Sequence, residues 1–296
     1  MNEKIIKFNV AVPTDEGFIG RKCKAPECGR YFKVKLASIR EEMFCPYCGV
    51  RFSKEELTTG DQKKYFKEVT KEKAKKYMYD EVDKIFGELA RKPQSKNVIF
   101  KHNPINYREK TVQPKYRELQ VDSELTCSEC NFLFQVYGIF GYCPGCHSEN
   151  IWIYDANFAI IQKEISTNPD PQRALRHAYS DLVSTFEIFC RKKAKTFSSE
   201  TTRFQVLFDT RNFFKKNLGI DILNGLKDQD ILALRRVFQK RHILEHNAGI
   251  INENYVRMIP EDAKLLNCHV ELSNGELKLA AETLRIALDN LSRAVE

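Results

Sequence analysis

The chain has 296 residues, 42% of them hydrophobic, and a formal net charge of +8 at pH 7. This length and composition suffice for about two folded domains and exclude a disordered chain. No apolar run reaches the ~20 residues that cross a bilayer, and the N-terminus lacks the apolar core of an export signal. We therefore expect a cytoplasmic protein with no membrane partner.

The cysteines indicate metal sites. The chain has 10 cysteines, and a cytosolic protein keeps its thiols reduced, which disfavours disulfides. Eight of them form two sets with short internal spacings: Cys23-x4-Cys28-x16-Cys45-x2-Cys48 and Cys127-x2-Cys130-x12-Cys143-x2-Cys146. Four thiolates with such spacing are the usual ligands of a tetrahedral zinc ion. We predict two structural zinc ions per chain, although iron could occupy the same ligands.

Both sets contain the sequence of a metal-binding turn. Cys45-Pro46-Tyr47-Cys48-Gly49 and Cys143-Pro144-Gly145-Cys146 resemble the knuckles of zinc ribbons and rubredoxins. The resemblance implies a small β zinc ribbon over residues 1–60 and a second over residues 119–154. Since protein ligands fill all four coordination positions, no metal-bound water can be activated and we expect no catalysis there. Cys190 and Cys268 lack paired neighbours and are expected to be ordinary thiols.

The basic excess of the chain lies between the two clusters, in residues 61–118. Apolar residues recur at steps of three and four from residue 61 to residue 91, which predicts one long amphipathic helix with a Lys-rich outer face. Residues 92–118 contain three prolines and little periodicity, so they predict an extended connector.

Helical patterns dominate the last part of the chain. Asp170 and Pro171 form a helix start signal, and three further helices are predicted over residues 201–218, 227–246 and 275–295. Four such helices with short connections make a bundle over residues 155–296. The predicted fold class is therefore α+β and multidomain: two small β zinc ribbons with a long connecting helix, followed by an all-α four-helix bundle.

The third helix of this bundle carries an unusual charge. Arg241 falls among Val237, Phe238 and Leu244 on the apolar stripe, so its guanidinium is directed toward a core or an interface. An ion pair with Glu245, four residues later, is the simpler structural explanation. His242 and His246 also share a face, as zinc-binding histidines do, but no third ligand is evident.

Arg241-x4-His246, with the polar His242 directly after the arginine, resembles the R-x4–6-H motif of the HEPN family of small helical bundles. The resemblance covers residues 155–296. It implies a metal-independent endoribonuclease in which a dimer brings two motifs together, often in toxin–antitoxin or antiviral defence systems. Other members of the family only bind or dimerise.

The same resemblance implies that Arg241, His242 and His246 are the catalytic residues. His246 would serve as general acid or base, and Arg241 would clamp phosphoryl oxygens. Residues five apart on a regular helix point about 140° from each other. We therefore expect either a distortion near Asn247 or a homodimer in which the two chains supply Arg and His to one site.

Two functions remain open at this point. The first is an RNA-directed endoribonuclease whose zinc ribbons position the substrate or a protein partner. The alternative is a non-catalytic adaptor that binds nucleic acid or protein through its ribbons and dimerises through its bundle. The segment Tyr31–Lys35 alternates apolar and basic residues, as a phosphate-contacting strand would, but solvated lysines on an amphipathic strand explain it more simply.

Overall fold

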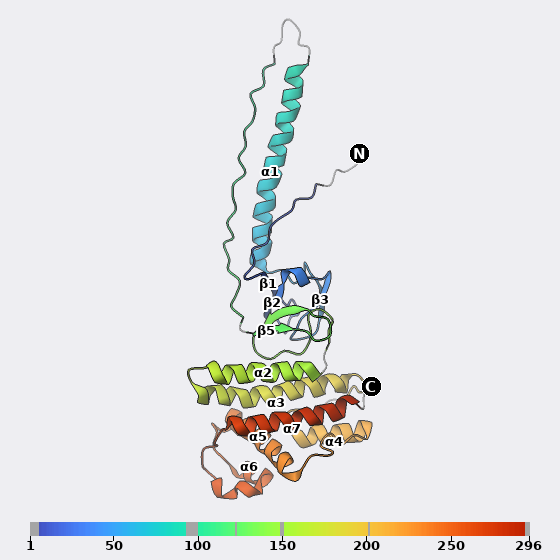
Figure 1. Ribbon diagram of the computed structural model, residues 1–296, viewed down its shortest axis with the longest axis vertical. Helices are drawn as coiled ribbons and strands as arrows, with labels where there is room; N and C mark the ends of the chain where they lie inside the picture. Colours follow the sequence, from blue (N-terminus) through green and yellow to red (C-terminus); the bar gives the residue numbers. More distant parts are fainter. Residues whose placement is uncertain (1–5, 93–99, 122, 149–150, 201, 294–296) are drawn as a thin grey trace.

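The computed structural model describes residues 6–92, 100–121, 123–148, 151–200 and 202–293. Predictions for residues 1–5, 93–99, 122, 149–150, 201 and 294–296 lie outside these ranges. Figure 1 shows three parts along the longest axis: a projecting helix with an extended connector beside it, a small β module and a bundle of helices. None of the helices in the described ranges is both long and apolar enough to cross a bilayer.

The two cysteine clusters share one β-sheet. Its strands are β1 (Phe18–Lys22), β2 (Tyr31–Lys35), β5 (Ser123–Thr126) and β6 (Leu133–Val136), in the order β1-β2-β6-β5. All neighbours are antiparallel, and the register places Val34 opposite Phe134. A 3-10 turn (Leu36–Ser38) leads to a separate hairpin of β3 (Glu42–Phe44) and β4 (Arg51–Ser53).

This arrangement differs from the two separate ribbons expected from the sequence. Phe32 and Val34 of the first cluster lie in the same buried core as Phe134 and Val136 of the second. Each cluster alone has too few apolar side chains for a core. The strands of both clusters therefore bury their apolar side chains in one common core. The module is therefore one folding unit with two knuckles.

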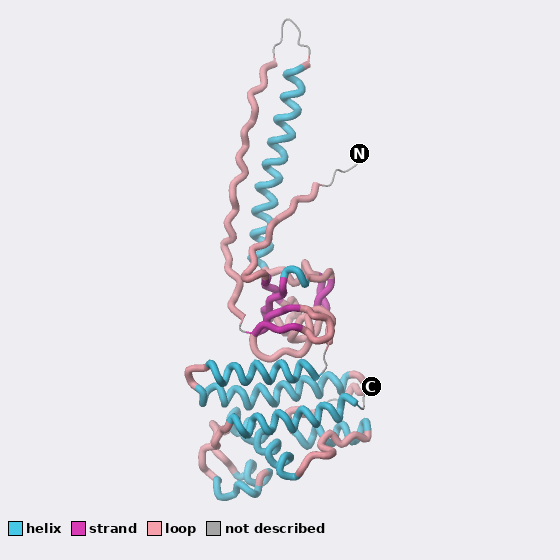
Figure 2. The backbone as a smooth tube through the Cα atoms, in the orientation of Figure 1, coloured by secondary structure: helices cyan, strands magenta, loops and turns pink. Residues whose placement is uncertain are grey.

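The long helix predicted after the first cluster is α1 (Gly60–Arg91). It begins with a capping box in which Thr59 and Gln62 satisfy each other's backbone amides. Gln62 is the one buried residue of this helix within the described part of the chain. Beyond its root, α1 packs mainly against the extended connector, residues 100–121, that runs back beside it in Figure 2, and Phe8 of the N-terminal segment contacts the Tyr77 ring with centroids 6.4 Å apart. The apolar side of the helix is therefore largely exposed, with no core to cover it.

Connector and helix meet through aromatic and polar contacts. The rings of Tyr79 and Tyr107 stack at 4.6 Å, and the Tyr107 hydroxyl donates a hydrogen bond to Glu72 at 2.8 Å. Farther along, His102 lies 2.8 Å from the carboxylate of Asp83. These contacts hold the two segments together as one arm.

The helical part contains α2 (Ile151–Thr167), α3 (Pro171–Lys195), α4 (Leu207–Leu218), α5 (Asp228–His246), α6 (Glu253–Met258), a 3-10 turn (Pro260–Leu265) and α7 (Asn274–Arg293). The four predicted helices correspond to α3, α4, α5 and α7, with α4 starting later than expected. Asp170 caps α3 as predicted, by accepting a hydrogen bond from the Arg173 amide at 3.0 Å.

Helix α2 joins the β module to the bundle. Its residue Ile153 belongs to the β-module core, whereas Tyr154 and Ile161 belong to the bundle core. The side-chain amide of Asn157 pairs with the backbone of Phe140, donating to its carbonyl at 2.7 Å and accepting from its amide at 3.0 Å. A helix buried on two sides in this way fixes the module against the bundle.

Candidate functional site

The first cysteine set is arranged as a metal site. Cys23 and Cys28 follow β1, and Cys45 and Cys48 lie in the turn between β3 and β4. The sulfur atoms of Cys23 and Cys48 are 3.7 Å apart, as are those of Cys28 and Cys45. Gly49, at a φ of 73°, closes the second turn with a hydrogen bond from its amide to the Cys45 carbonyl at 2.9 Å.

The second set repeats this geometry. Cys127 and Cys130 lie between β5 and β6, and the sulfur pairs Cys127–Cys146 and Cys130–Cys143 measure 3.8 and 3.7 Å. In each set the four sulfur atoms all lie within 4.8 Å of one another. A tetrahedron of sulfurs ~2.3 Å from a metal has edges of about 3.8 Å, so both sets fit a four-coordinate metal ion with no open position.

Several of the cysteine thiols are buried, as the ligands of a structural metal usually are. Cys45 and Cys143 are buried, and burial raises the pKa of both thiols. A bound metal favours the thiolate form and so offsets that cost of burial. Gly145 of the second knuckle contacts the Phe132 ring so closely that an added Cβ would come within 2.4 Å of it. These features indicate that the eight cysteines form two metal-binding sites.

A pocket of about 300 Å³ lies beside the second half of α5. Its polar lining comes from α5 and from the segment that precedes α4, and it consists of Arg203, Gln205, Arg235, Gln239, Arg241, His242 and His246. None of the described residues that line it is an Asp or a Glu. Arg203 and Arg241 are paired with Asp209 and Glu245, which lie outside the lining, so the inner surface of the pocket is basic although its charge is partly balanced from behind.

Arg241 lies at the wall of this pocket, with its side chain 13% exposed. The ion pair with Glu245 expected from the sequence is confirmed, with nitrogen and oxygen 2.9 Å apart. Its other terminal nitrogen donates a hydrogen bond to the Gln205 side chain at 2.8 Å. The Nε of Arg241 is buried and has no hydrogen-bond partner among the described residues, so a ligand reaches it only if the side chain shifts.

The two histidines are neighbours one turn apart. The ring centroids of His242 and His246 are 4.8 Å apart, and the His246 side chain is 61% exposed. Desolvation lowers the pKa of His242, and the nearby His246 and Arg241 lower it further. His242 is therefore mainly neutral near pH 7 and able to accept a proton. The described residues offer the pair no third ligand at metal-binding distance.

Arg241 and His246 line the same pocket in a single chain. On a regular helix the two residues point apart, so a second chain or a distortion was expected to bring them together. A helical wheel ignores the length of the arginine side chain, which extends to Gln205 on the segment before α4. The second chain is therefore not required to bring these two residues together.

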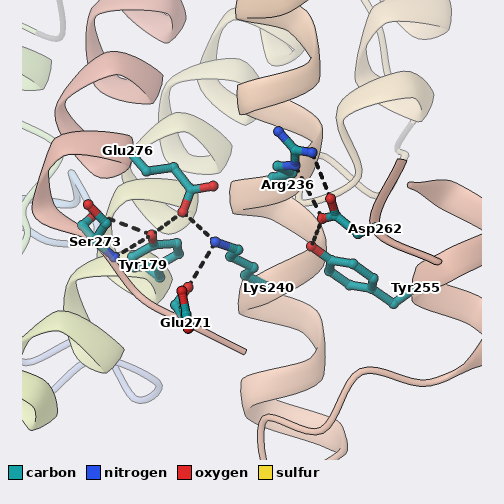
Figure 3. A network of polar contacts seen from close by, with 8 residues as sticks. All are labelled: Tyr179, Arg236, Lys240, Tyr255, Asp262, Glu271, Ser273 and Glu276. Carbon is teal, nitrogen blue, oxygen red and sulfur yellow. Dashed lines mark hydrogen bonds and ion pairs between the residues drawn. The ribbon is translucent and has the colours of Figure 1, made fainter. Parts of the chain in front are cut away.

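The opposite side of α5 is tied to its neighbours by the polar network of Figure 3. Arg236 forms an ion pair with Asp262 at 2.6 Å, and Tyr255 donates a hydrogen bond to the same carboxylate at 2.9 Å. Lys240 pairs with Glu276 at 2.6 Å. Burial would raise the pKa of Asp262, but the contacts from Arg236 and Tyr255 hold it below its usual range. These cations are neutralised and fix the helix that presents the pocket.

Sequence reasoning missed Arg235 and Gln205. The buried Nε of Arg235 also lacks a partner in the described structure, while its terminal nitrogen donates to the Met258 carbonyl. A signal existed for Arg235, since it precedes His242 by seven residues, which places the two on one face of α5. Gln205 lies before α4, and only the tertiary fold brings it to α5.

The lysines of β2 do not form a phosphate-contacting surface. Lys33 is 2% exposed and forms an ion pair with Asp15 at 2.7 Å. Lys35 donates a hydrogen bond to the Glu16 carbonyl at 2.8 Å. Both ammonium groups are bound within the β module. The two lysines of this strand are therefore neither placed to contact phosphates nor fully solvated.

Comparisons of the chain with protein-family models, with curated proteins and with solved structures found no match.

Proposed function

We propose that this protein acts on RNA through the cationic pocket beside α5, as a HEPN-type endoribonuclease that uses no metal in its chemistry. The observation that carries the proposal is the lining of this pocket. It combines Arg241, whose Nε is buried without a partner, with two histidines and no acidic residue among those described. A phosphodiester is a suitable ligand for such a basic lining, beside the carboxylates that already pair with Arg203 and Arg241 from outside it.

The chemistry asked of these groups is self-cleavage of RNA. The 2′-oxygen of a ribose attacks the adjacent phosphorus, the bond to the 5′-oxygen breaks, and a 2′,3′-cyclic phosphate and a 5′-hydroxyl result. The lowered pKa of His242 suits it to take the 2′-hydroxyl proton, and His246 then gives a proton to the leaving 5′-oxygen. Arg241 stabilises the charge that accumulates on the phosphoryl oxygens.

We propose zinc as the metal of both four-cysteine sites, with a structural role that supports the shared sheet. Four thiolates in a tetrahedron are its usual structural ligand set. Metal analysis of the purified protein should find two zinc ions per chain. Bound iron would give visible absorbance and would overturn the assignment of the metal while leaving the pocket proposal intact.

A nuclease assay tests the proposal. Wild-type protein should cleave single-stranded RNA, and His246→Ala should slow cleavage by about 10²- to 10⁴-fold, the usual contribution of general acid–base catalysis. His177→Ala is the matched control, because His177 is an exposed histidine on α3 outside this pocket. Equal rates for both variants would show that the activity comes from elsewhere. If folded, metal-loaded wild type cuts no RNA, the non-catalytic adaptor is the better account.

A further inference from the structure

Three lysines form a row on the root half of α1. Lys63, Lys67 and Lys71 follow one another at intervals of four residues, which places them on one helix face about 6 Å apart. All three are exposed. Within the described ranges, their ammonium groups make no hydrogen bond or ion pair, in contrast to Lys64 with Asp61 and Lys75 with Glu72.

The connector does not cover this row. It contacts α1 through Glu72, Tyr79 and Asp83, which lie on a different side of the helix. Beyond Lys75, the face that carried the lysines presents Met78, Val82, Ile85 and Leu89 instead, each of them exposed. The basic surface is therefore confined to the half of α1 nearest the β module.

The row is held at a fixed position relative to the sheet. Gln62, one residue before it, is fully buried, and its amide donates to the Gly20 carbonyl at 2.9 Å and to Glu118 at 3.0 Å. Glu118 also accepts a hydrogen bond from Tyr31 of β2. The root of α1 is therefore anchored to the first and second strands and to the returning connector at once, which preorganises the lysines.

We propose that Lys63, Lys67 and Lys71 bind the phosphate backbone of an RNA segment that lies outside the pocket. The inference rests on the proposed function, because the polyanion is taken to be the same RNA. Ammonium groups act as point charges on flexible stems and contact phosphates without reading bases. In Figure 1 the β module lies between the root of α1, which carries the row, and the bundle that holds α5, so only a longer RNA contacts both.

RNA fits the row better than an acidic protein does, because the pocket at the other end is also cationic. One polyanion satisfies both surfaces, and contacts to successive phosphates require no particular sequence. The row would thus select RNA by length, and it would strengthen binding without taking part in the reaction.

Binding measurements on the His246→Ala protein, which leaves the RNA intact, test this inference. The test variant is Lys63→Gln/Lys67→Gln/Lys71→Gln. The matched control, Lys73→Gln/Lys76→Gln/Lys84→Gln, removes the same charge from other sides of α1. Lys and Gln have similar helix propensities, so the helix is retained in both. The probes are single-stranded uridine RNAs of about 40 and about 8 nucleotides, titrated at several salt concentrations.

The logarithm of the affinity for the long RNA is plotted against the logarithm of the salt concentration. Each phosphate contact contributes about 0.7 to the slope for single strands, so loss of three contacts should make the slope of the row variant shallower by about two. The control should keep the parental slope, and the short RNA should bind both variants equally. Equal slopes for row variant and control would overturn the inference while the pocket proposal stands. If the parental protein binds neither RNA, the proposed function itself fails.

Discussion

Arg241 and Glu245 form an ion pair of 2.9 Å across one turn of α5, and the same carboxylate accepts a hydrogen bond from Ser180 of α3 at 2.9 Å. Glu245 thus fixes the guanidinium from outside the pocket, while Gln205 holds it from the other side. The Arg241 side chain nevertheless lines the pocket and is 13% exposed, so part of it stays open to a ligand. The simple structural explanation of Arg241 and the functional one are therefore compatible.

Arg241→Lys should weaken RNA binding although it keeps the charge. An ammonium group cannot contact Glu245, Gln205 and a phosphate with the fixed fork of a guanidinium. Loss of one charge-assisted hydrogen bond costs about 1.5–3 kcal/mol, or roughly 10- to 100-fold in affinity. Equilibrium binding of a short RNA measures the loss. Arg176→Lys, at an exposed position on α3, should have no effect, and an equal loss in both variants would refute a specific role for Arg241.

Removal of metal should unfold the β module. Cys45→Ser should lower the metal content and cause loss of β-sheet signal, because Cys45 is a buried ligand and the shared core is small. Cys268→Ser is the matched control, since Cys268 is exposed and belongs to neither cysteine set. Metal analysis and circular dichroism check both variants. A Cys45→Ser protein with two tightly bound ions would contradict the ligand assignment.

The pKa of His242 should lie below its ordinary value in the folded chain. Partial desolvation, His246 and Arg241 all disfavour the protonated form, so the folded state binds fewer protons than the unfolded state as pH falls. The histidine therefore lowers stability progressively below the unfolded pKa of ~6.5, and this effect levels off below the folded pKa. NMR titration of the imidazole measures the shift, and His246→Ala should raise the value toward normal. An unshifted His242 would remove the argument for a neutral base.

A homodimer formed through the helical part remains a prediction. Leu279 and Ile286 are exposed, 42% and 48%, and lie seven residues apart on one face of α7. Ile286→Lys should convert a dimer to monomers in light scattering, whereas Lys278→Gln, at an exposed neighbouring site, should not. A wild-type monomer at micromolar concentration would exclude this interface but would not remove the pocket, which one chain completes.

Local patterns in the sequence identified the features with local causes. Cysteine spacing encodes the two metal sites because each knuckle is a short turn. The three- and four-residue steps of the apolar residues were sufficient to locate α1. Helix α2 was missed because it is buried by the β module on one side and by the bundle on the other, so Ile153 and Ile161 follow no single stripe.

The long-range pairings could not be predicted in this way. The β2–β6 pairing joins Val34 to Phe134, 100 residues apart, and neither strand carries a signal that names its partner. The pocket similarly depends on Gln205, which reaches α5 only after the bundle has packed. The motif residues were identified from the sequence, but the arrangement that brings Arg241 and His246 to one pocket was not.

The products of RNA cleavage test the central claim most directly. RNA is incubated with purified protein and a chelator at a level that leaves both cysteine sites loaded, and the ends of the fragments are identified by mass spectrometry. The account predicts continued cleavage, with 2′,3′-cyclic phosphate and 5′-hydroxyl ends, and loss of these products in His246→Ala. Fragments with 5′-phosphate ends, or cleavage only with added Mg²⁺, would contradict it.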